Sequence, residues 1–108
     1  MEVEELSKKT TSWAKGIPEI SAVILFGSRA KGTAKEGSDW DVCCIVNNGS
    51  SGWYGTWIYE AENWEQGFCN ATGINKNEVN FTTSTSDQVV SGLLESSRVL
   101  YVQRPTKT

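Results

Sequence analysis

Residues 27–41 of this chain read Gly27-Ser28-Arg29-Ala30-Lys31-Gly32-Thr33-Ala34-Lys35-Glu36-Gly37-Ser38-Asp39-Trp40-Asp41. Two apolar runs flank the stretch, residues 22–26 before it and residues 42–46 after it. Each run is too short for a helix and is rich in branched side chains, so each predicts a buried strand. Between the strands we expect a sharp turn, a short helix starting near Ser28 and a polar loop over residues 32–38. The second strand is expected to begin at Trp40.

The ends of these two strands carry residues suited to phosphate and metal chemistry. Gly27 lets a ligand approach the backbone, and Ser28 adds a hydroxyl donor beside the amides of a helix start. Asp39 and Asp41 project from the same face of a strand roughly 6.5–7 Å apart, from a rise of about 3.3 Å per residue. Their carboxylates can converge on one or two hard cations, which bridge phosphate oxygens during an in-line displacement. The pattern predicts a cradle for a triphosphate and magnesium.

Three basic residues lie around the glycine turn of a chain that is acidic overall. The net charge is −3 and the chain contains no histidine. This composition excludes a His-based catalyst or metal site, and it gives a long nucleic acid no overall basic attraction. Arg29, Lys31 and Lys35 suit a small polyanion, or they form an ordinary solvated face.

Two other interpretations of the motif fail on spacing. The two glycines that bracket the short helix fit the start of a Walker A loop, but Thr33 stands where that loop needs its phosphate-binding lysine. The aspartate pair could open a calcium loop, but Cys43 occupies the next alternate position and an apolar strand follows. A purely structural interpretation stays open, in which Ser38 is a cap and the aspartates are solvated.

The rest of the chain alternates between helical and extended patterns. Helices are predicted over residues 2–15, 53–72 and 85–94, and further strands over residues 78–83 and 99–102. A Thr85-x-x-Gln88 capping pattern opens the last helix. With no internal repeat evident, the 108 residues are expected to form one domain, residues 1–108, with a frayed tail over 105–108. The predicted fold class is α/β (α+β), a small mixed sheet flanked by helices.

Four aromatic residues of the helix over 53–72 lie within a narrow arc: Trp53, Trp57, Trp64 and Phe68. An arc of this kind predicts the face that a helix buries in the core. The alternative is a patch for a protein partner, since five tryptophans are a large number for a short chain.

The cysteines and the absence of long apolar segments bear on location. Cys43, Cys44 and Cys69 form an odd set without a C-x-x-C pair, so we interpret all three as reduced packing residues. No stretch is apolar enough to cross a bilayer and no charged-then-apolar leader follows Met1. A cytoplasmic location is the expectation, with no membrane partner.

The motif residues resemble those of a known family. Phe26-Gly27-Ser28-Arg29-Ala30-Lys31-Gly32, followed by Ser38-Asp39-Trp40-Asp41-Val42, is similar to the signature of the polymerase-β-type nucleotidyltransferase superfamily, in particular its minimal single-domain members. The resemblance implies that Gly27 and Ser28 contact the triphosphate, with Arg29, Lys31 and Ser38 as further nucleotide-binding positions. It implies that Asp39 and Asp41 are catalytic ligands of Mg²⁺, with two ions, and that the fold is polymerase-β-like.

One position departs from the family pattern. The alternation over residues 78–83 places Val79 and Phe81 toward the core and Glu78, Asn80 and Thr82 on the other face. The family's third catalytic carboxylate matches Asn80, and an amide brings no negative charge and cannot take a proton. Three explanations stay open: Glu78 substitutes, the protein is a binding-only relative, or the residue was changed deliberately to trap a complex.

The resemblance also implies a reaction. Minimal members of this kind are similar to the antitoxin halves of bacterial toxin–antitoxin pairs, which modify a helical HEPN-type ribonuclease toxin on tyrosine. We therefore expect transfer of a nucleoside monophosphate from a nucleoside triphosphate, ATP first, to a hydroxyl acceptor on a protein partner. Small molecules and RNA ends are other acceptors in the superfamily. The alternative is a non-catalytic nucleotide-binding module that docks onto a partner, which Asn80 favours.

Overall fold

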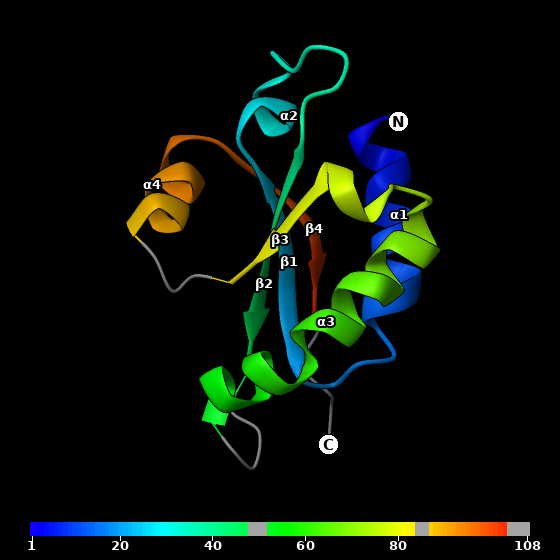
Figure 1. Ribbon diagram of the computed structural model, residues 1–108, viewed down its shortest axis with the longest axis vertical. Helices are drawn as coiled ribbons and strands as arrows, with labels where there is room; N and C mark the ends of the chain where they lie inside the picture. Colours follow the sequence, from blue (N-terminus) through cyan, green and yellow to red (C-terminus); the bar gives the residue numbers. More distant parts are fainter. Residues whose placement is uncertain (48–51, 84–86, 104–108) are drawn as a thin grey trace.

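A computed structural model describes residues 1–47, 52–83 and 87–103 of the chain. Its centre is a four-stranded sheet in the order β3-β2-β1-β4, with helices on both sides (Figure 1). The strands are β1 (Ile20–Phe26), β2 (Trp40–Val46), β3 (Val79–Thr82) and β4 (Ser97–Val102). The helices are α1 (Val3–Ala14), α2 (Ser28–Lys31), α3 (Gly52–Thr72) and α4 (Asp87–Glu95), and η1 (Lys76–Glu78) is a 3₁₀ turn. This mixed sheet flanked by helices confirms the fold class predicted from the sequence.

Strand pairing brings distant parts of the motif together. β1 is antiparallel to both β2 and β4, and Phe26 at its end is the register partner of Asp41. β3 runs parallel to β2, with Asp41 opposite Asn80. A parallel pair needs a long crossover connection, and α3 lies in that connection. The sheet therefore places the end of β1, the start of β2 and the middle of β3 side by side.

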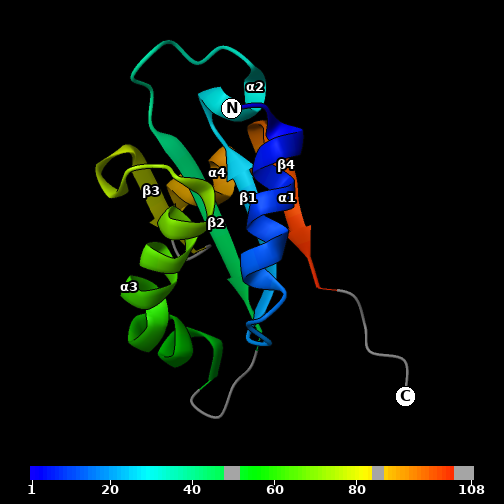
Figure 2. The same ribbon diagram turned by 90° about the vertical axis from the view of Figure 1, so that its right-hand side faces the viewer.

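The two faces of the sheet are covered unequally. α1 and α3 lie on one face and α4 on the other (Figure 1), and the view turned by 90° shows α1 in front of the sheet (Figure 2). Gly92 of α4 packs against the Phe26 ring, so Phe26 points to the α4 face. Because strand side chains alternate, Leu25 points to the opposite face, and so does Val42, the register partner of Leu25. Both side chains are fully buried there.

Most of the predicted elements are confirmed, with small shifts at their ends. β1 begins at Ile20, before the predicted residue 22, and α4 ends at Glu95. The prediction that Glu78 begins a strand is wrong, because Glu78 closes the 3₁₀ turn η1 and β3 starts at Val79. The Thr85 capping position, the connection at 48–51 and the tail at 105–108 lie outside the described residues.

The aromatic arc of α3 divides into a buried and an exposed half. Trp64 and Phe68 are buried, and Trp57 packs partly against the same core. Trp53 is 37% exposed, and near it Tyr54 and Tyr59 are 50% and 85% exposed. The core interpretation is correct for the second half of the helix, and the first half presents aromatic surface.

The cysteines lie in the interior of the protein. Cys43, Cys44 and Cys69 are free and buried, as the packing interpretation predicts. In the part of the chain that the structure describes, no helix combines the length and the apolar character needed to cross a membrane.

Candidate active site

The bend at the end of β1 lies against the carboxylate of Asp41. Gly27 has φ +74° and ψ −156°, a conformation that is essentially restricted to glycine. A Cβ built at this position would collide with Oδ2 of Asp41. The bend and the carboxylate therefore fit together only because residue 27 has no side chain.

Asn80 approaches the same carboxylate from the neighbouring strand. It is the register partner of Asp41, and its Nδ2 donates a hydrogen bond of 2.9 Å to Asp41 Oδ1. Asp41 is half-buried and Asn80 is exposed. The position that the family resemblance assigns to a third carboxylate is thus occupied by an amide that faces Asp41.

Asp39 stands just before β2. Trp40, which separates Asp39 from Asp41 in the sequence, is buried. Alternation therefore puts the two aspartates on the face opposite the Trp40 side chain. Asp39 is exposed, and it is not among the residues that line the cleft described next. The structure brings Asp41 into the cleft and leaves Asp39 outside its lining.

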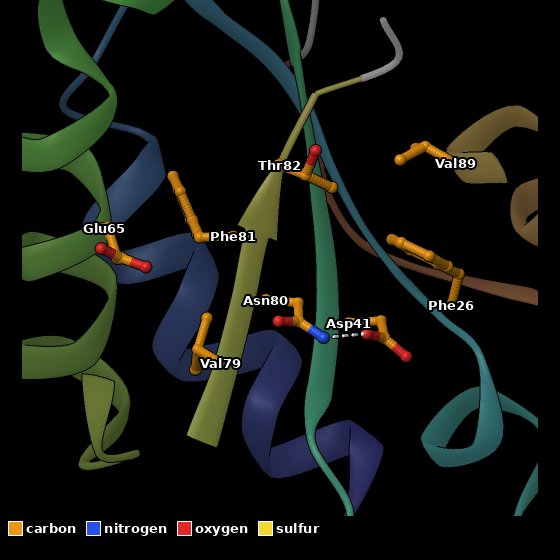
Figure 3. Close-up of a pocket in the computed structure, with 8 residues that line it drawn as sticks. All are labelled: Phe26, Asp41, Glu65, Val79, Asn80, Phe81, Thr82 and Val89. Atoms are coloured by element: carbon orange, nitrogen blue, oxygen red, sulfur yellow. Dashed lines mark hydrogen bonds between the residues drawn. The ribbon is translucent and has the colours of Figure 1, made fainter. Parts of the chain in front are cut away.

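A cleft of about 510 Å³ opens beside β3. Its lining residues are Phe26, Asp41, Glu65, Val79, Asn80, Phe81, Thr82 and Val89 (Figure 3). The strand divides them: the side chains of Val79 and Phe81 point toward α3 and Glu65, whereas Asn80 and Thr82 point the other way, toward Asp41 (Figure 3). Glu65 therefore shares the cleft with Asp41 but lies across β3 from it.

Several lining residues could not be identified from the motif. Phe26 and Val89 belong to apolar patterns that predict core positions, yet the contact of Gly92 with Phe26 makes α4 a wall of the cleft. Thr82 shares a face with Asn80, as strand alternation predicts. Glu65 has no sequence signal that separates it from other acidic residues of α3.

Arg29 supports the loop that leads into β2. Its Nε and Nη2 donate to the Ser38 carbonyl at 3.2 and 2.7 Å, and its guanidinium lies 4.2 Å from the centre of the Trp40 ring. The Ser38 hydroxyl in turn accepts a hydrogen bond of 3.0 Å from the backbone N–H of Lys35. Arg29 and Ser38 therefore form hydrogen bonds within the protein, and these bonds hold the loop that precedes Asp39.

Lys31 is engaged by a distant acid. Its Nζ donates a hydrogen bond to Glu95 at the end of α4, and the two form an ion pair. This hydrogen bond, with the attraction of the Lys31 charge, lowers the pKa of Glu95 below its ordinary value of 4.5. Arg98 also donates to the Ala30 carbonyl at 3.3 Å. The short helix α2 is thus fastened to the α4–β4 unit.

The first turn of α2 presents the other predicted phosphate ligands. Ser28 opens the helix, and the amides of Ala30 and Lys31 both bond to the Gly27 carbonyl. Amides at the first positions of a helix have no acceptor within it, so those of Ser28 and Arg29 suit an anionic ligand.

Burial raises the pKa of the Cys43 thiol to about 11, so this neighbour of the site stays a neutral thiol at physiological pH.

The donor set can be tested against a divalent cation. Asp39 and Asp41 supply hard carboxylate oxygens, and Mg²⁺ is commonly held by one or two carboxylates together with water and substrate phosphates. The absent side chain at Gly27 lets Asp41 Oδ2 lie against the bend. Within residues 1–47, 52–83 and 87–103, no three His, Cys, Asp or Glu residues are grouped to hold a metal. The residues fit a cation that the nucleotide helps to bind.

Comparison with known proteins identifies the family of the chain. The family model described as Polymerase beta, Nucleotidyltransferase matches residues 8–105. Among solved structures, the chain is similar to one in a crystal structure of a toxin–antitoxin with AMP-PNP, at 17% identity and a TM-score of 0.60, covering 91% of this chain and 74% of that one. At that identity the likeness concerns the fold, and no curated protein sequence matches significantly. Because the family model spans nearly the whole sequence, the chain belongs to the polymerase beta nucleotidyltransferase family.

Proposed function

We propose that this protein transfers a nucleoside monophosphate from a nucleoside triphosphate, ATP first, to a hydroxyl group on a protein partner. The observation that carries the proposal is the contact between the Gly27 bend and the Asp41 carboxylate. Because residue 27 has no side chain, the Asp41 carboxylate can lie against the start of α2, so a cation ligand stands directly beside backbone amides that suit phosphate.

Each predicted site residue has a role in this proposal. The Ser28 hydroxyl and the opening amides of α2 bind phosphate oxygens, and Gly27 lets the Asp41 carboxylate lie beside them. Asp39 and Asp41 would hold Mg²⁺, whose chemistry is to neutralise charge on the phosphate oxygens. Arg29 and Ser38 position the loop before Asp39, and Lys31, through its ion pair with Glu95, holds the end of α2 in place.

The reaction balances without any further reagent. The acceptor hydroxyl oxygen forms a bond to the α-phosphorus, the bond between the α-phosphorus and the bridging oxygen breaks, and pyrophosphate leaves. The hydroxyl proton passes to a solvent water molecule. Asn80 cannot take that proton because its amide is neutral and has no free basic site. A carboxylate at position 80 would be able to accept it.

Two observations support a protein acceptor. The chain of similar fold comes from a crystal structure of a toxin–antitoxin, and the first half of α3 exposes Trp53, Tyr54, Ile58 and Tyr59. Exposed aromatic surface is typical of sites that bind other proteins. A HEPN-type toxin is the first partner to test.

The experiment combines the purified protein, the product of the neighbouring gene and magnesium with radiolabelled ATP, GTP, CTP or UTP. We expect label on the neighbour's product from ATP, and loss of that label with Asp41→Ala. The matched control is Glu62→Ala, which removes one acid from an exposed position on α3 and is expected to keep full labelling. Labelling that persists in Asp41→Ala would contradict the proposal.

A non-catalytic nucleotide-binding module is the second candidate, and the hydrogen bond from Asn80 to Asp41 favours it. In that case the protein binds a nucleotide with magnesium and docks onto a partner, and no phosphoryl bond changes. The same mixtures separate the two candidates. Tight magnesium-dependent nucleotide binding with no label in any mixture supports the module.

A further inference from the structure

The Asp41 carboxylate is held from two sides. The Asn80 amide donates to its Oδ1 at 2.9 Å, and its Oδ2 faces the Gly27 bend. The Asp41 and Asn80 side chains lie on the same side of β3, with the amide nitrogen toward the carboxylate (Figure 3). Because the two residues are register partners on paired strands, the backbone fixes their separation.

The charge available at this point suits one divalent cation. The protein's own contribution is the two negative charges of Asp39 and Asp41, which match a single ion of charge +2. The Asn80 amide adds no charge, and its N–H groups direct positive partial charge toward Asp41. To ligate a cation through its oxygen, Asn80 would have to turn its amide and give up the hydrogen bond to Asp41.

The nearby acids do not replace the missing charge. Glu65 lies across β3 from Asp41 (Figure 3), and its carboxylate is 3.7 Å from the Lys76 ammonium group. Glu78 belongs to the 3₁₀ turn before β3 and is exposed. Among the residues that the structure describes, no group of three acidic, His or Cys side chains surrounds a common point.

We propose that Asn80 is a positioning residue that orients Asp41 and limits the site to a single divalent cation. This inference rests on the proposed function only in taking the cleft as the nucleotide site. Asp39, Asp41 and the phosphate oxygens would hold the cation that remains. A second ion beside it would meet the amide of Asn80 in place of an anionic ligand.

The test counts cations without any turnover. Mn²⁺ is titrated into the protein, first alone and then with α,β-methylene-ATP, whose α–β linkage cannot be cleaved, and free Mn²⁺ is followed by its EPR signal. The nucleotide alone is the baseline. We expect one Mn²⁺ per wild-type protein in both titrations. In Asn80→Asp we expect two with nucleotide, together with the broadened spectrum of a spin-coupled Mn²⁺ pair.

Two further variants test the positioning role. Asn80→Ala removes the hydrogen bond without adding charge, so we expect one Mn²⁺ bound about tenfold more weakly, a factor that corresponds to about 1.4 kcal/mol. Asn63→Asp makes the same change of charge at an exposed position on α3 and is expected to leave the count and affinity unchanged. Circular dichroism verifies that each variant is folded.

The outcomes separate this inference from the proposed function. Two Mn²⁺ in the wild type, or one in folded Asn80→Asp, would overturn the single-cation proposal, and unchanged affinity in Asn80→Ala would overturn the positioning role. Absence of label transfer with one bound Mn²⁺ counts against catalysis and leaves the cation count standing. If Asn80→Asp fails to fold, the number of Mn²⁺ ions bound by the wild type still tests the single-cation proposal, and the Mn²⁺ affinity of Asn80→Ala still tests the positioning role.

Discussion

The α carbon of Gly27 lies so close to the Asp41 carboxylate that no side chain fits between them. The two residues come from different ends of the motif, and the antiparallel pairing of β1 with β2 brings them together. The phosphate-binding bend and the metal-binding carboxylate of the proposed site are therefore one packed unit. A change at either residue should alter the other.

The first prediction concerns Gly27→Ala. A methyl group would displace the Asp41 carboxylate, and alanine strains this backbone conformation, which together should lower the free energy of unfolding by about 1–3 kcal/mol. We expect nucleotide affinity in the presence of magnesium to fall at least about tenfold, equivalent to about 1.4 kcal/mol. Urea unfolding and calorimetric titration measure the two effects.

Gly37→Ala is the matched control for Gly27→Ala. Gly37 also has a positive φ of +85°, but a Cβ there meets nothing within 4 Å. We expect a cost of about 1–2 kcal/mol for the left-handed backbone and unchanged nucleotide affinity. An equal loss of affinity in both variants would show that strain, and not the contact with Asp41, is responsible.

The second prediction concerns Arg29. Its hydrogen bonds to the Ser38 carbonyl and its position over Trp40 should make Arg29→Ala less stable by about 1–3 kcal/mol. Arg29→Lys should recover little of this, because an ammonium group lacks the planar fork that reaches one carbonyl with two N–H groups. Urea unfolding tests both, with Lys35→Ala in the loop that Arg29 supports expected to change little. A fully stable Arg29→Lys contradicts the structural role.

The third prediction concerns the ion pair of Lys31 with Glu95. The pKa of Glu95 is lowered in the folded protein by this partner, so the stabilisation is present above the unfolded value near 4.5 and is lost as the pH falls through the lower folded value. We expect Lys31→Met to return the pKa of Glu95 toward 4.5. A carbon-13 NMR titration of the Glu95 carboxyl group measures the shift, and an unchanged pKa would exclude Lys31 as its cause.

The fourth prediction concerns turnover in Asn80→Asp. A carboxylate at this position can accept the proton of the acceptor hydroxyl, and general base catalysis contributes about a hundredfold or more. We expect label transfer at saturating magnesium to rise by about that factor. An unchanged or lower rate in the folded variant would show that Asn80 does not occupy the place of the family's third carboxylate.

The same substitution has a predicted effect on stability. Without a metal ion, two carboxylates at register partners 41 and 80 repel each other, because like charges directly opposite on neighbouring strands are destabilising. We expect Asn80→Asp to melt at a lower temperature than the wild type in EDTA and to regain stability with Mg²⁺. A melting temperature that does not respond to Mg²⁺ would count against a shared cation site.

The central unit of the fold could be predicted from the sequence because its signals are local. The apolar runs on either side of residues 27–41 predict β1 and β2, and the polar stretch between Gly32 and Ser38 predicts the loop. Alternation over residues 78–83 places Asn80 and Thr82 on one face, as observed (Figure 3). These features depend on periodicity and turn chemistry over a few residues.

Other features could not be predicted because they depend on tertiary contacts. Lys31 meets Glu95 only after α4 docks beside α2, and the contact of Gly92 with Phe26 depends on the same docking. Helical periodicity alone does not show that the sheet leaves Trp53 exposed while it buries Trp64. The direction of the Asn80 amide follows from the parallel register of β2 and β3.

Asn80 is exposed on β3, an edge strand of the sheet, so its side chain does not pack in the core. Asparagine and aspartate have nearly the same shape, and their codons differ by one base. A single mutation can therefore change the charge at position 80 with almost no effect on packing. In this fold, a carboxylate can be gained or lost at position 80 without rebuilding the scaffold.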